Sequence, residues 1–387
     1  MHNKSIGIFG VLDSLGGWKV KAIKLFDLIV GSFLARIFPA KSGSGMIAGP
    51  IKKILVIRPG GIGDAIFLLP LLRSIKNQNP DLQVDILCEA RNSQVFQSQG
   101  SICNQIYCYD QGFWWRELFG GAYDVIIDTE QWHYLSALVS YFLPSRVNAG
   151  FASRQLRSKL FNCPVAYDQN AYEMENFKNL FLPFFPDVRG VVDVRHSFDV
   201  DEETLKWARR KVPSGCIALF LGASVPLKRL DFNQNISLIN ILLAPGMNSS
   251  IILLGGADVR DEGERLSRHF NNSRILNFVA KTSLEQSAAL IKCSRLLIGP
   301  DSGLIHLASA VGIPVFAIFG PSNIQKWGPK GADDKILSLK LECSPCSQYS
   351  YTLPTCHRSY KCMKSLDMNK VADILAAGVF KNHAPKQ

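Results

Sequence analysis

Two common signatures of nucleotide-binding proteins are missing from this sequence. It has no Gly-Lys-Ser/Thr triplet, which excludes a Walker A loop, and the turn at 60–63 lacks the third glycine of a Gly-x-Gly-x-x-Gly fingerprint. The apolar run between Asp27 and Arg36 is too short to cross a bilayer, and no small-residue cleavage site of a signal peptide follows it. There is no internal repeat and no long low-complexity tract. We therefore expect a globular chain that is neither exported nor membrane-spanning.

Segments typical of strands and of helices alternate along the 387 residues, of which 47% are hydrophobic. Such a chain can bury cores for two domains of ordinary size. Strands are predicted at 53–58, 83–88, 123–128, 216–221 and 250–254, and their alternation with helices predicts an α/β fold with parallel sheets. We place a first α/β domain at 51–190 and a second at 196–345, with a connector around 183–193. Residues 1–50 form an N-terminal extension, and residues 346–387 form a tail.

Two polar turns, each following a predicted strand, are the strongest candidates for a binding site. In the first, Asp301, Ser302 and Gly303 fall where a helix begins, and His306 lies one turn further on. A helix start offers free N–H groups and partial positive charge, which suits a phosphate, although Asp301 could instead simply cap a core helix. The second turn, 59–64, precedes a helix that we expect Asp64 to cap. Because ligands of open α/β sheets bind at the carboxyl ends of strands, both turns should line one cleft if the domains face each other.

Five blocks, in this order, resemble the heptosyltransferase family of bacterial lipopolysaccharide synthesis, glycosyltransferase family 9. They are Arg58-x-x-Gly61-x-Gly63-Asp64, residues 221–224 followed by Lys228-Arg229, residues 253–256, residues 281–284, and Asp301-Ser302-Gly303-Leu304-x-His306. The resemblance covers residues 51 to 375. It implies a GT-B type fold with two facing Rossmann-like domains, the first for an acceptor and the second for ADP-heptose. It also implies that the helix predicted at 368–379 packs back on the first domain.

The resemblance further implies roles for individual residues. Asp64 matches the family's proposed general base, a role that competes with capping its helix. The residues expected to bind the donor nucleotide are Ser224, Lys228, Glu262, Thr282, Asp301, Ser302, Gly303 and His306. Glu262 represents the acidic run 258–264, which we expect to hold the ribose-binding acid. The acceptor-side loop comprises Arg58, Gly61 and Gly63, and acceptor phosphates could meet Arg58, Arg154 or Arg157.

These assignments describe an inverting glycosyltransferase that needs no cofactor besides its co-substrate, an ADP-sugar. Cations and helix N-termini can stabilise a leaving diphosphate without a metal, and no Asp-x-Asp pair lies near the donor blocks. Three alternatives remain open. They are the same fold acting on another nucleotide sugar or acceptor, a sugar-nucleotide epimerase, and a non-catalytic membrane-associated binding module.

Positive charge is concentrated near the start of the chain. Residues 1–60 hold nine Lys/Arg and two acidic residues, in a chain of formal net charge +11. Apolar residues recur there at helical spacing, namely Trp18, Ala22, Leu25, Phe26, Ile29, Phe33 and Ile37. Such a stripe suits either a helix on an anionic membrane surface or a helix packed on the domain. The expected partners are ADP-heptose and a lipid A or core oligosaccharide acceptor at the inner membrane face, and no nucleic acid.

The ten cysteines are expected to be reduced thiols in a cytoplasm. Cys343, Cys346, Cys356 and Cys362 cluster near the end, but only the first pair has metal-ligand spacing, so a zinc site, a redox-sensitive pair and plain packing all remain candidates. We assign no metal. Cys88, Cys163, Cys216 and Cys293 lie in or near apolar runs and are expected in the core.

Overall fold

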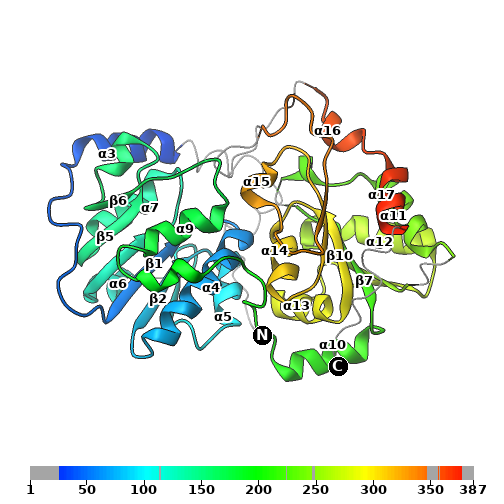
Figure 1. The fold of residues 1–387 in the computed structure, drawn as a ribbon, viewed down its shortest axis with the longest axis horizontal. Coiled ribbons are helices and arrows are strands. Elements are labelled where there is room, and N and C mark those ends of the chain that lie inside the picture. The colour runs from blue at the N-terminus through cyan, green and yellow to red at the C-terminus, as the bar shows by residue number, and fades with distance from the viewer. Residues whose placement is uncertain are drawn as a thin grey trace, which may run out of the picture. The chain divides into compact units, whose positions relative to one another are not determined.

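The computed structural model describes residues 26–112, 115–223, 225–245, 249–346, 356 and 358–376. It contains two six-stranded sheets, which confirms the predicted α/β class (Figure 1). No helix in these ranges is long and apolar enough to span a membrane. Ser224 and residues 1–25, with Trp18, Ala22 and Leu25 of the apolar stripe, lie outside the described residues.

The first sheet has the strand order β3-β2-β1-β4-β5-β6. Its strands are β1 (Lys53–Arg58), β2 (Gln83–Cys88), β3 (Gln105–Cys108), β4 (Tyr123–Asp128), β5 (Ser145–Phe151) and β6 (Cys163–Val165). β1, β4, β5 and β6 run parallel, with Ile54 opposite Val125 between the two central strands. The helices of this half are α4 (Ile62–Gln78), α5 (Ala90–Gln97), α6 (Trp115–Gly120), α7 (Tyr134–Phe142), α8 (Gln155–Ser158) and α9 (Glu173–Phe181).

The second sheet is parallel throughout and has the order β12-β11-β10-β7-β8-β9. Its strands are β7 (Cys216–Phe220), β8 (Ile251–Leu254), β9 (Ile275–Asn277), β10 (Ser294–Pro300), β11 (Val315–Ile318) and β12 (Lys335–Leu337). Its α-helices are α10 (Glu202–Lys211), α11 (Phe232–Leu243), α12 (Arg260–Phe270), α13 (Leu284–Lys292), α14 (Gly303–Ala310), α15 (Ile324–Trp327), α16 (Lys361–Lys364) and α17 (Met368–Ala376). Short 3-10 turns lie at η3 (Pro186–Gly190), η4 (Pro226–Lys228) and η5 (Ala257–Val259).

Both sheets follow the same doubly wound order, counted from their first strands. In each, the chain winds one way through three strands and then returns to the other side of its starting strand. The direction therefore reverses between β1 and β4 in the first sheet and between β7 and β10 in the second. Ligands of open α/β sheets bind beyond the carboxyl ends of strands at such a switch point. The topology therefore indicates that the segments after these four strands are candidates for ligand binding.

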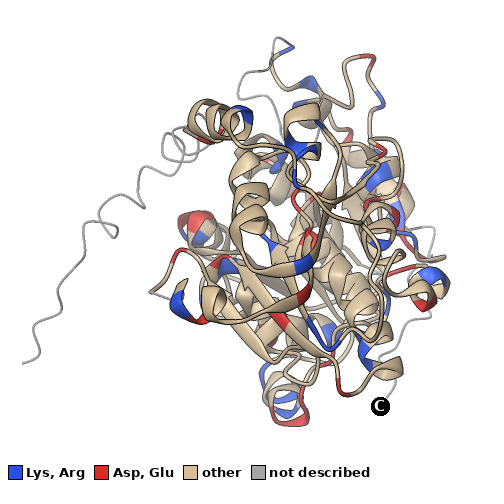
Figure 2. Cartoon of the chain, turned by 90° about the vertical axis from the view of Figure 1, so that its left-hand side faces the viewer, with Lys and Arg blue, Asp and Glu red and all other residues tan. Residues whose placement is uncertain are grey.

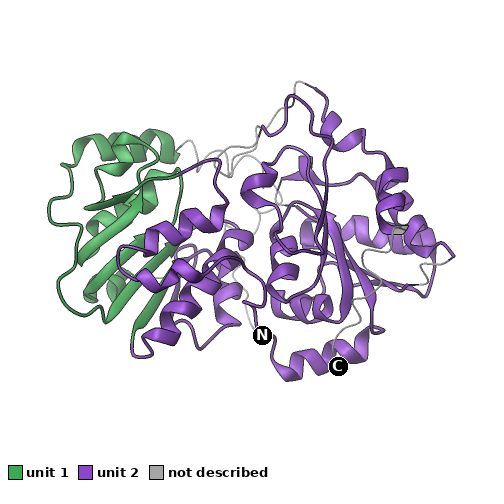
Figure 3. Ribbon diagram, in the orientation of Figure 1, with its two compact units in different colours: residues 1–59, 82–87, 112–167 green, residues 60–81, 88–111, 168–387 purple. Residues whose placement is uncertain are grey.

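Two compact units divide the chain differently from the expected domain boundaries (Figure 3). One comprises residues 1–59, 82–87 and 112–167, and the other comprises 60–81, 88–111 and 168–387. The segments 60–81 and 88–111 group with the later residues because α4 packs on α14 and α5 packs on α13. Sequence position alone assigned α4 to the first domain, whereas its contacts include α14, a helix more than two hundred residues further along.

The final helix also differs from expectation. Val371 and Leu375 of α17 are buried in the core of the second sheet, in one cluster with Leu238 of α11 and Ile217 of β7. The prediction that this helix packs back on the first domain is therefore wrong for its described residues. Its apolar face lies against α11.

Candidate functional site

The turn after β1 delivers Asp64 into the first turn of α4. The helix begins at Ile62, three residues earlier than expected, with Gly61 at the N-cap position and no side chain bonded as a cap. Asp64 is therefore not the N-cap residue, which corrects the sequence prediction. A carboxylate in a first helical turn is stabilised by the helix dipole.

An ion pair joins the segments that follow the two strands of the second switch point. Lys228 ends η4, in the loop after β7, and Asp301 follows β10 directly. The Lys228 Nζ lies 2.6 Å from Asp301 Oδ2, and the side chains are 15% and 7% exposed. Burial alone would raise the pKa of Asp301, but the charge of Lys228 and its hydrogen bond hold that pKa below its usual value. Asp301 is thus ionised at neutral pH.

The start of α14 lies immediately after Asp301. Ser302 is its N-cap residue, yet its side chain makes no capping hydrogen bond, and its buried Oγ has no partner among the described residues. A helix N-terminus leaves backbone N–H groups without intrahelical partners. An uncapped start beside a lysine can therefore accept an anion.

His306 lies one turn into α14 and is buried, 4% exposed. Burial lowers its pKa to about 4, although the charge of Asp301 acts in the opposite direction. Its ring centroid lies 4.6 Å from that of Phe67 in α4. His306 is therefore a neutral imidazole at pH 7, and from α14 it packs against α4.

Two glycines let α4 and α14 approach closely. A Cβ on Gly63 would lie 2.8 Å from His306 Cδ2, and one on Gly303 would lie 3.1 Å from the Gly63 backbone nitrogen. Larger residues at these positions would push the helices apart. The structure thus brings the Gly61–Asp64 turn and the Asp301–His306 turn together through backbone contact.

The other predicted donor residues occupy separate loops. Glu262, in the first turn of α12, accepts a hydrogen bond from Asn235 Nδ2 at 2.8 Å, and burial raises its pKa. Thr282 Oγ1 bonds Ser287 Oγ at 2.8 Å. Within the described ranges, no hydrogen bond or ion pair joins Glu262 or Thr282 to the Lys228–Asp301 pair. Arg229 instead holds the loop itself, donating to Ala223 O at 2.8 Å and to Asp258.

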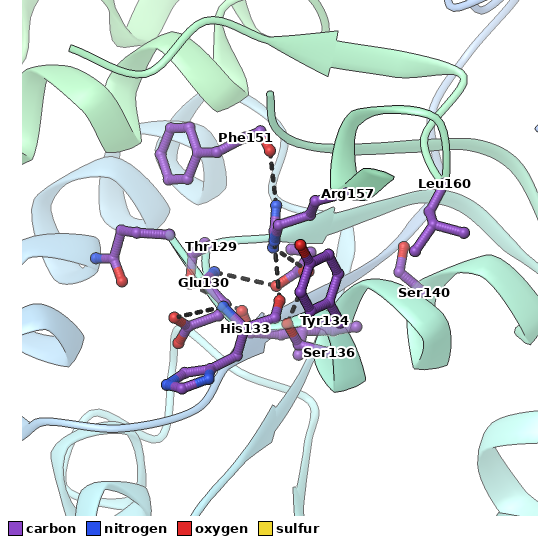
Figure 4. A network of polar contacts seen from close by, with 12 residues as sticks. Thr129, Glu130, His133, Tyr134, Ser136, Ser140, Phe151, Arg157 and Leu160 are labelled. Carbon is purple, nitrogen blue, oxygen red and sulfur yellow. Dashed lines mark hydrogen bonds and ion pairs between the residues drawn. The ribbon is translucent and has the colours of Figure 1, made fainter. Parts of the chain in front are cut away.

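A buried charge network at the first switch point was missed by sequence analysis, which named only its arginines. Arg58 ends β1 and is 1% exposed; it donates to Thr129 O at 2.9 Å and lies 3.5 Å from Glu130 Oε2. Arg157 is fully buried, 2.6 Å from Asp128 Oδ2, and donates to Phe151 O at 2.7 Å (Figure 4).

The charge network fixes the loop after β4. Asp128 accepts from the Glu130 backbone at 3.0 Å and from Ser136 Oγ at 3.0 Å, and burial raises its pKa to about 6 despite Arg157. The guanidinium groups of Arg58 and Arg157 are therefore committed to protein partners. Arg154, the third predicted phosphate contact, stacks on Trp132 with its Cζ 3.1 Å from the ring centroid. The sequence signal that could have revealed this charge network was a charged residue at the end of an apolar strand.

The four late cysteines lie near one another and are all partly buried. Burial, together with neighbouring thiols, raises the pKa of Cys346 and of Cys362. Among the residues that the structure describes, no His, Cys, Asp and Glu side chains are grouped so as to hold a metal ion. Of the expected core cysteines, Cys88, Cys216 and Cys293 are buried and Cys163 is partly buried.

Known proteins resemble this chain in both sequence and fold. Residues 113–357, well over half of the chain, match the family model "Glycosyltransferase family 9 (heptosyltransferase)". Lipopolysaccharide heptosyltransferase 1 of Pseudomonas aeruginosa is 25% identical over 324 residues, covering 78% of this chain and 87% of that protein.

Two solved structures share the fold. E. coli ADP-heptose lps heptosyltransferase II superposes with a TM-score of 0.67 at 20% identity, covering 86% of this chain and all of that one. E. coli heptosyltransferase WaaC with ADP gives 0.63 at 16% identity, covering 86% and 99%. Together with the switch-point geometry of both sheets, the matches show that this chain is a glycosyltransferase and belongs to glycosyltransferase family 9, the heptosyltransferases.

Proposed function

We propose that this chain transfers heptose from ADP-heptose to an acceptor sugar of the lipopolysaccharide core, with inversion at the anomeric carbon and without a metal ion. The observation that carries the proposal is the arrangement of Lys228, Asp301 and the uncapped start of α14 at the switch point between β7 and β10. One solved relative is described with ADP bound, which supports an ADP-sugar donor.

Lys228 and the start of α14 would hold the diphosphate of the donor. In the free chain, Asp301 neutralises Lys228 at 2.6 Å and keeps the ammonium in place. A diphosphate would add negative charge beside the free N–H groups of α14 and the unpartnered Ser302 Oγ. Cations and oriented N–H groups stabilise the charge that develops on a leaving phosphate oxygen, so a metal ion is not required.

Asp64 would serve as the general base. Asp64 directly follows Gly63, the residue whose backbone meets Gly303 at the start of α14. Its carboxylate would take the proton of the acceptor hydroxyl while that oxygen attacks the anomeric carbon. The bond from this carbon to the phosphate oxygen breaks, and ADP leaves with the electron pair. A single displacement of this kind inverts the anomeric centre.

The reaction belongs in the cytoplasm, where the ten cysteines would remain reduced. The acceptor would be the lipid A or core oligosaccharide at the inner face of the inner membrane. Glu262 and Thr282 would then border the nucleoside, and Ser224 the diphosphate, as the family resemblance implies.

The deciding experiment measures ADP release by the purified chain with ADP-heptose, with and without truncated lipopolysaccharide, in the presence of EDTA. We expect release that depends on the acceptor and survives EDTA. Asp64→Asn should lower the rate by roughly 10²–10⁴-fold while ADP binding, measured by calorimetry, is unchanged. Asp81→Asn, an exposed carboxylate after the same helix, is the matched control and should be fully active.

Each alternative gives a different result. Consumption of the donor without acceptor would indicate an epimerase. Binding without turnover of any donor would indicate a binding module, and turnover of another nucleotide sugar alone would overturn the ADP-heptose assignment. Full activity of Asp64→Asn would overturn the base assignment.

A further inference from the structure

A short helical segment before the first sheet is docked by its small and polar residues. It consists of a π-helical turn, η2 (Asp27–Gly31), and α3 (Ser32–Ile37), which follow one another without a break. Asp27, Gly31 and Ala35, spaced four residues apart, are its buried positions. A helix packed on a soluble domain normally buries its large apolar side chains and exposes its polar ones. Here the three buried positions are small or polar, and Leu34 adds a partly buried apolar contact with the same core cluster as Ala35.

The docking contacts are specific. Asp27 Oδ1 accepts hydrogen bonds from the backbone nitrogens of Tyr134 at 3.0 Å and Leu135 at 2.7 Å, so this carboxylate caps α7 from outside. His133 Nδ1 lies 2.9 Å from Asp27 Oδ2. A Cβ on Gly31 would lie 2.9 Å from Tyr134 Cβ, and Ala35 is fully buried. These contacts fix which face of the segment points away from the sheet.

The outer face carries large apolar side chains. Phe26, Ile29, Phe33 and Ile37 are 54%, 59%, 58% and 59% exposed, and Leu28 is 47% exposed. We call these five residues the outer stripe. The stripe continues toward α7, where Phe142 is 47% exposed and packs edge-on against Phe38 with centroids 4.8 Å apart. Exposed apolar patches of this kind mark surfaces that meet another protein or a membrane.

Charge around the outer stripe favours one class of partner. Residues 26–50 contain a single acidic residue, Asp27, and it is buried in the docking contact. Arg36 is exposed beside the stripe, and Lys159 Nζ donates to the Arg36 carbonyl at 3.2 Å. Four further lysines and one aspartate precede residue 26 in the sequence. Figure 2 views the chain from the side on which Figure 1 labels α3, with Lys and Arg in blue and Asp and Glu in red.

We propose that the outer stripe inserts into the interface of an anionic phospholipid bilayer and holds the enzyme on the membrane. A helix lying in the interface buries its apolar face at the level of the acyl boundary while basic residues meet anionic headgroups. This inference deepens the proposed function, because a lipid-linked acceptor lies in such a membrane. The inference rests on the proposed function for that acceptor, but the residues that carry it are remote in sequence from those proposed to bind the nucleotide.

The test is co-sedimentation of the full-length chain with vesicles of phosphatidylcholine alone or with added phosphatidylglycerol. We expect binding to the anionic vesicles that weakens with salt. Ile29→Ser/Phe33→Ser should weaken this binding at least tenfold, since both side chains contribute apolar area to the interface. Val192→Ser, which removes an apolar side chain 70% exposed elsewhere, is the matched control and should bind as the unaltered chain does.

Other occupants of the stripe give distinguishable results. If the double variant binds vesicles as well as the unaltered chain does, the proposal is overturned. If the lipid-free chain is a dimer that the double variant converts to a monomer, the partner is a second copy, which also overturns it. ADP binding, followed by calorimetry without lipid, reports on the proposed function separately, so either idea can fail alone.

Discussion

Lys228 and the buried Asp301 form a partly buried ion pair, 2.6 Å from Nζ to Oδ2, beyond the two strands where the second sheet reverses its winding direction. The residues are 73 positions apart in sequence. The pair positions a cation beside an uncapped helix start, and it keeps that cation ordered before any ligand arrives. A buried charge that lost its partner would be costly, so the two residues depend on each other.

This dependence predicts a non-additive pair of substitutions. Lys228→Gln should reduce the free energy of unfolding by about 3 kcal/mol, because it leaves the Asp301 carboxylate buried and unpaired. Lys228→Gln/Asp301→Asn should recover most of that loss, because two neutral amides can bond each other. Urea denaturation of the single and double variants measures the coupling. ADP affinity should stay low in both, and a double variant that regained it would argue against Lys228 as a phosphate ligand.

The close approach of α4 and α14 predicts that alanine substitutions at two nearby glycines will differ in their effect on stability. Gly63→Ala would place a methyl group 2.8 Å from His306 and should destabilise the chain by about 1–3 kcal/mol. Gly61→Ala is the matched comparison, because its Cβ would meet nothing closer than 4.0 Å and its φ is −72°. Thermal unfolding of both variants distinguishes them. Equal stability would mean that α4 and α14 can separate without cost.

Burial of His306 predicts a specific loss of stability in acid. Its pKa is about 4 in the folded chain, against 6.5 for an ordinary histidine. The unfolded chain therefore takes up a proton at higher pH than the folded chain does. The contribution of His306 to stability is complete above pH 6.5 and falls as the pH drops toward 4.

The measurement is the difference in unfolding free energy between the unaltered chain and His306→Gln at several pH values. This difference should shrink by about 3 kcal/mol between pH 6.5 and 4 and stay constant below that. His269→Gln, at an exposed histidine, is the matched control for the substitution itself. A pH-independent difference for His306 would mean that the imidazole titrates normally.

The cap supplied by Asp27 predicts a local effect on α7. Asp27→Ala leaves the first N–H groups of α7 without acceptors and should cost about 1–2 kcal/mol. Hydrogen exchange at the Tyr134 and Leu135 amides should accelerate. Asp201→Ala, which removes the exposed N-cap side chain of α10, should cost less and leave α7 unchanged. Unaltered exchange at Tyr134 after Asp27→Ala would show that water replaces the cap fully.

The apolar patterns of the sequence were sufficient to predict the central strands, including β1, β2 and β4 at their observed limits. Strands buried on both faces are nearly continuous apolar runs, so burial is encoded locally. The glycine turns were equally readable, since they interrupt those runs at strand ends. Helix starts were less certain, and α4 begins before Asp64 because Gly61 can take the N-cap position without a side-chain cap.

By itself the sequence determined an α/β chain with two strand-terminal turns and a basic, apolar first segment. Only the tertiary structure decided that Lys228 meets Asp301, that α4 packs on α14, that α17 joins the second core, and that Phe33 points outward while Asp27 points in. The physical reason is that local patterns report whether a residue is buried. Its partner depends on contacts between segments far apart in the chain, which no local pattern records.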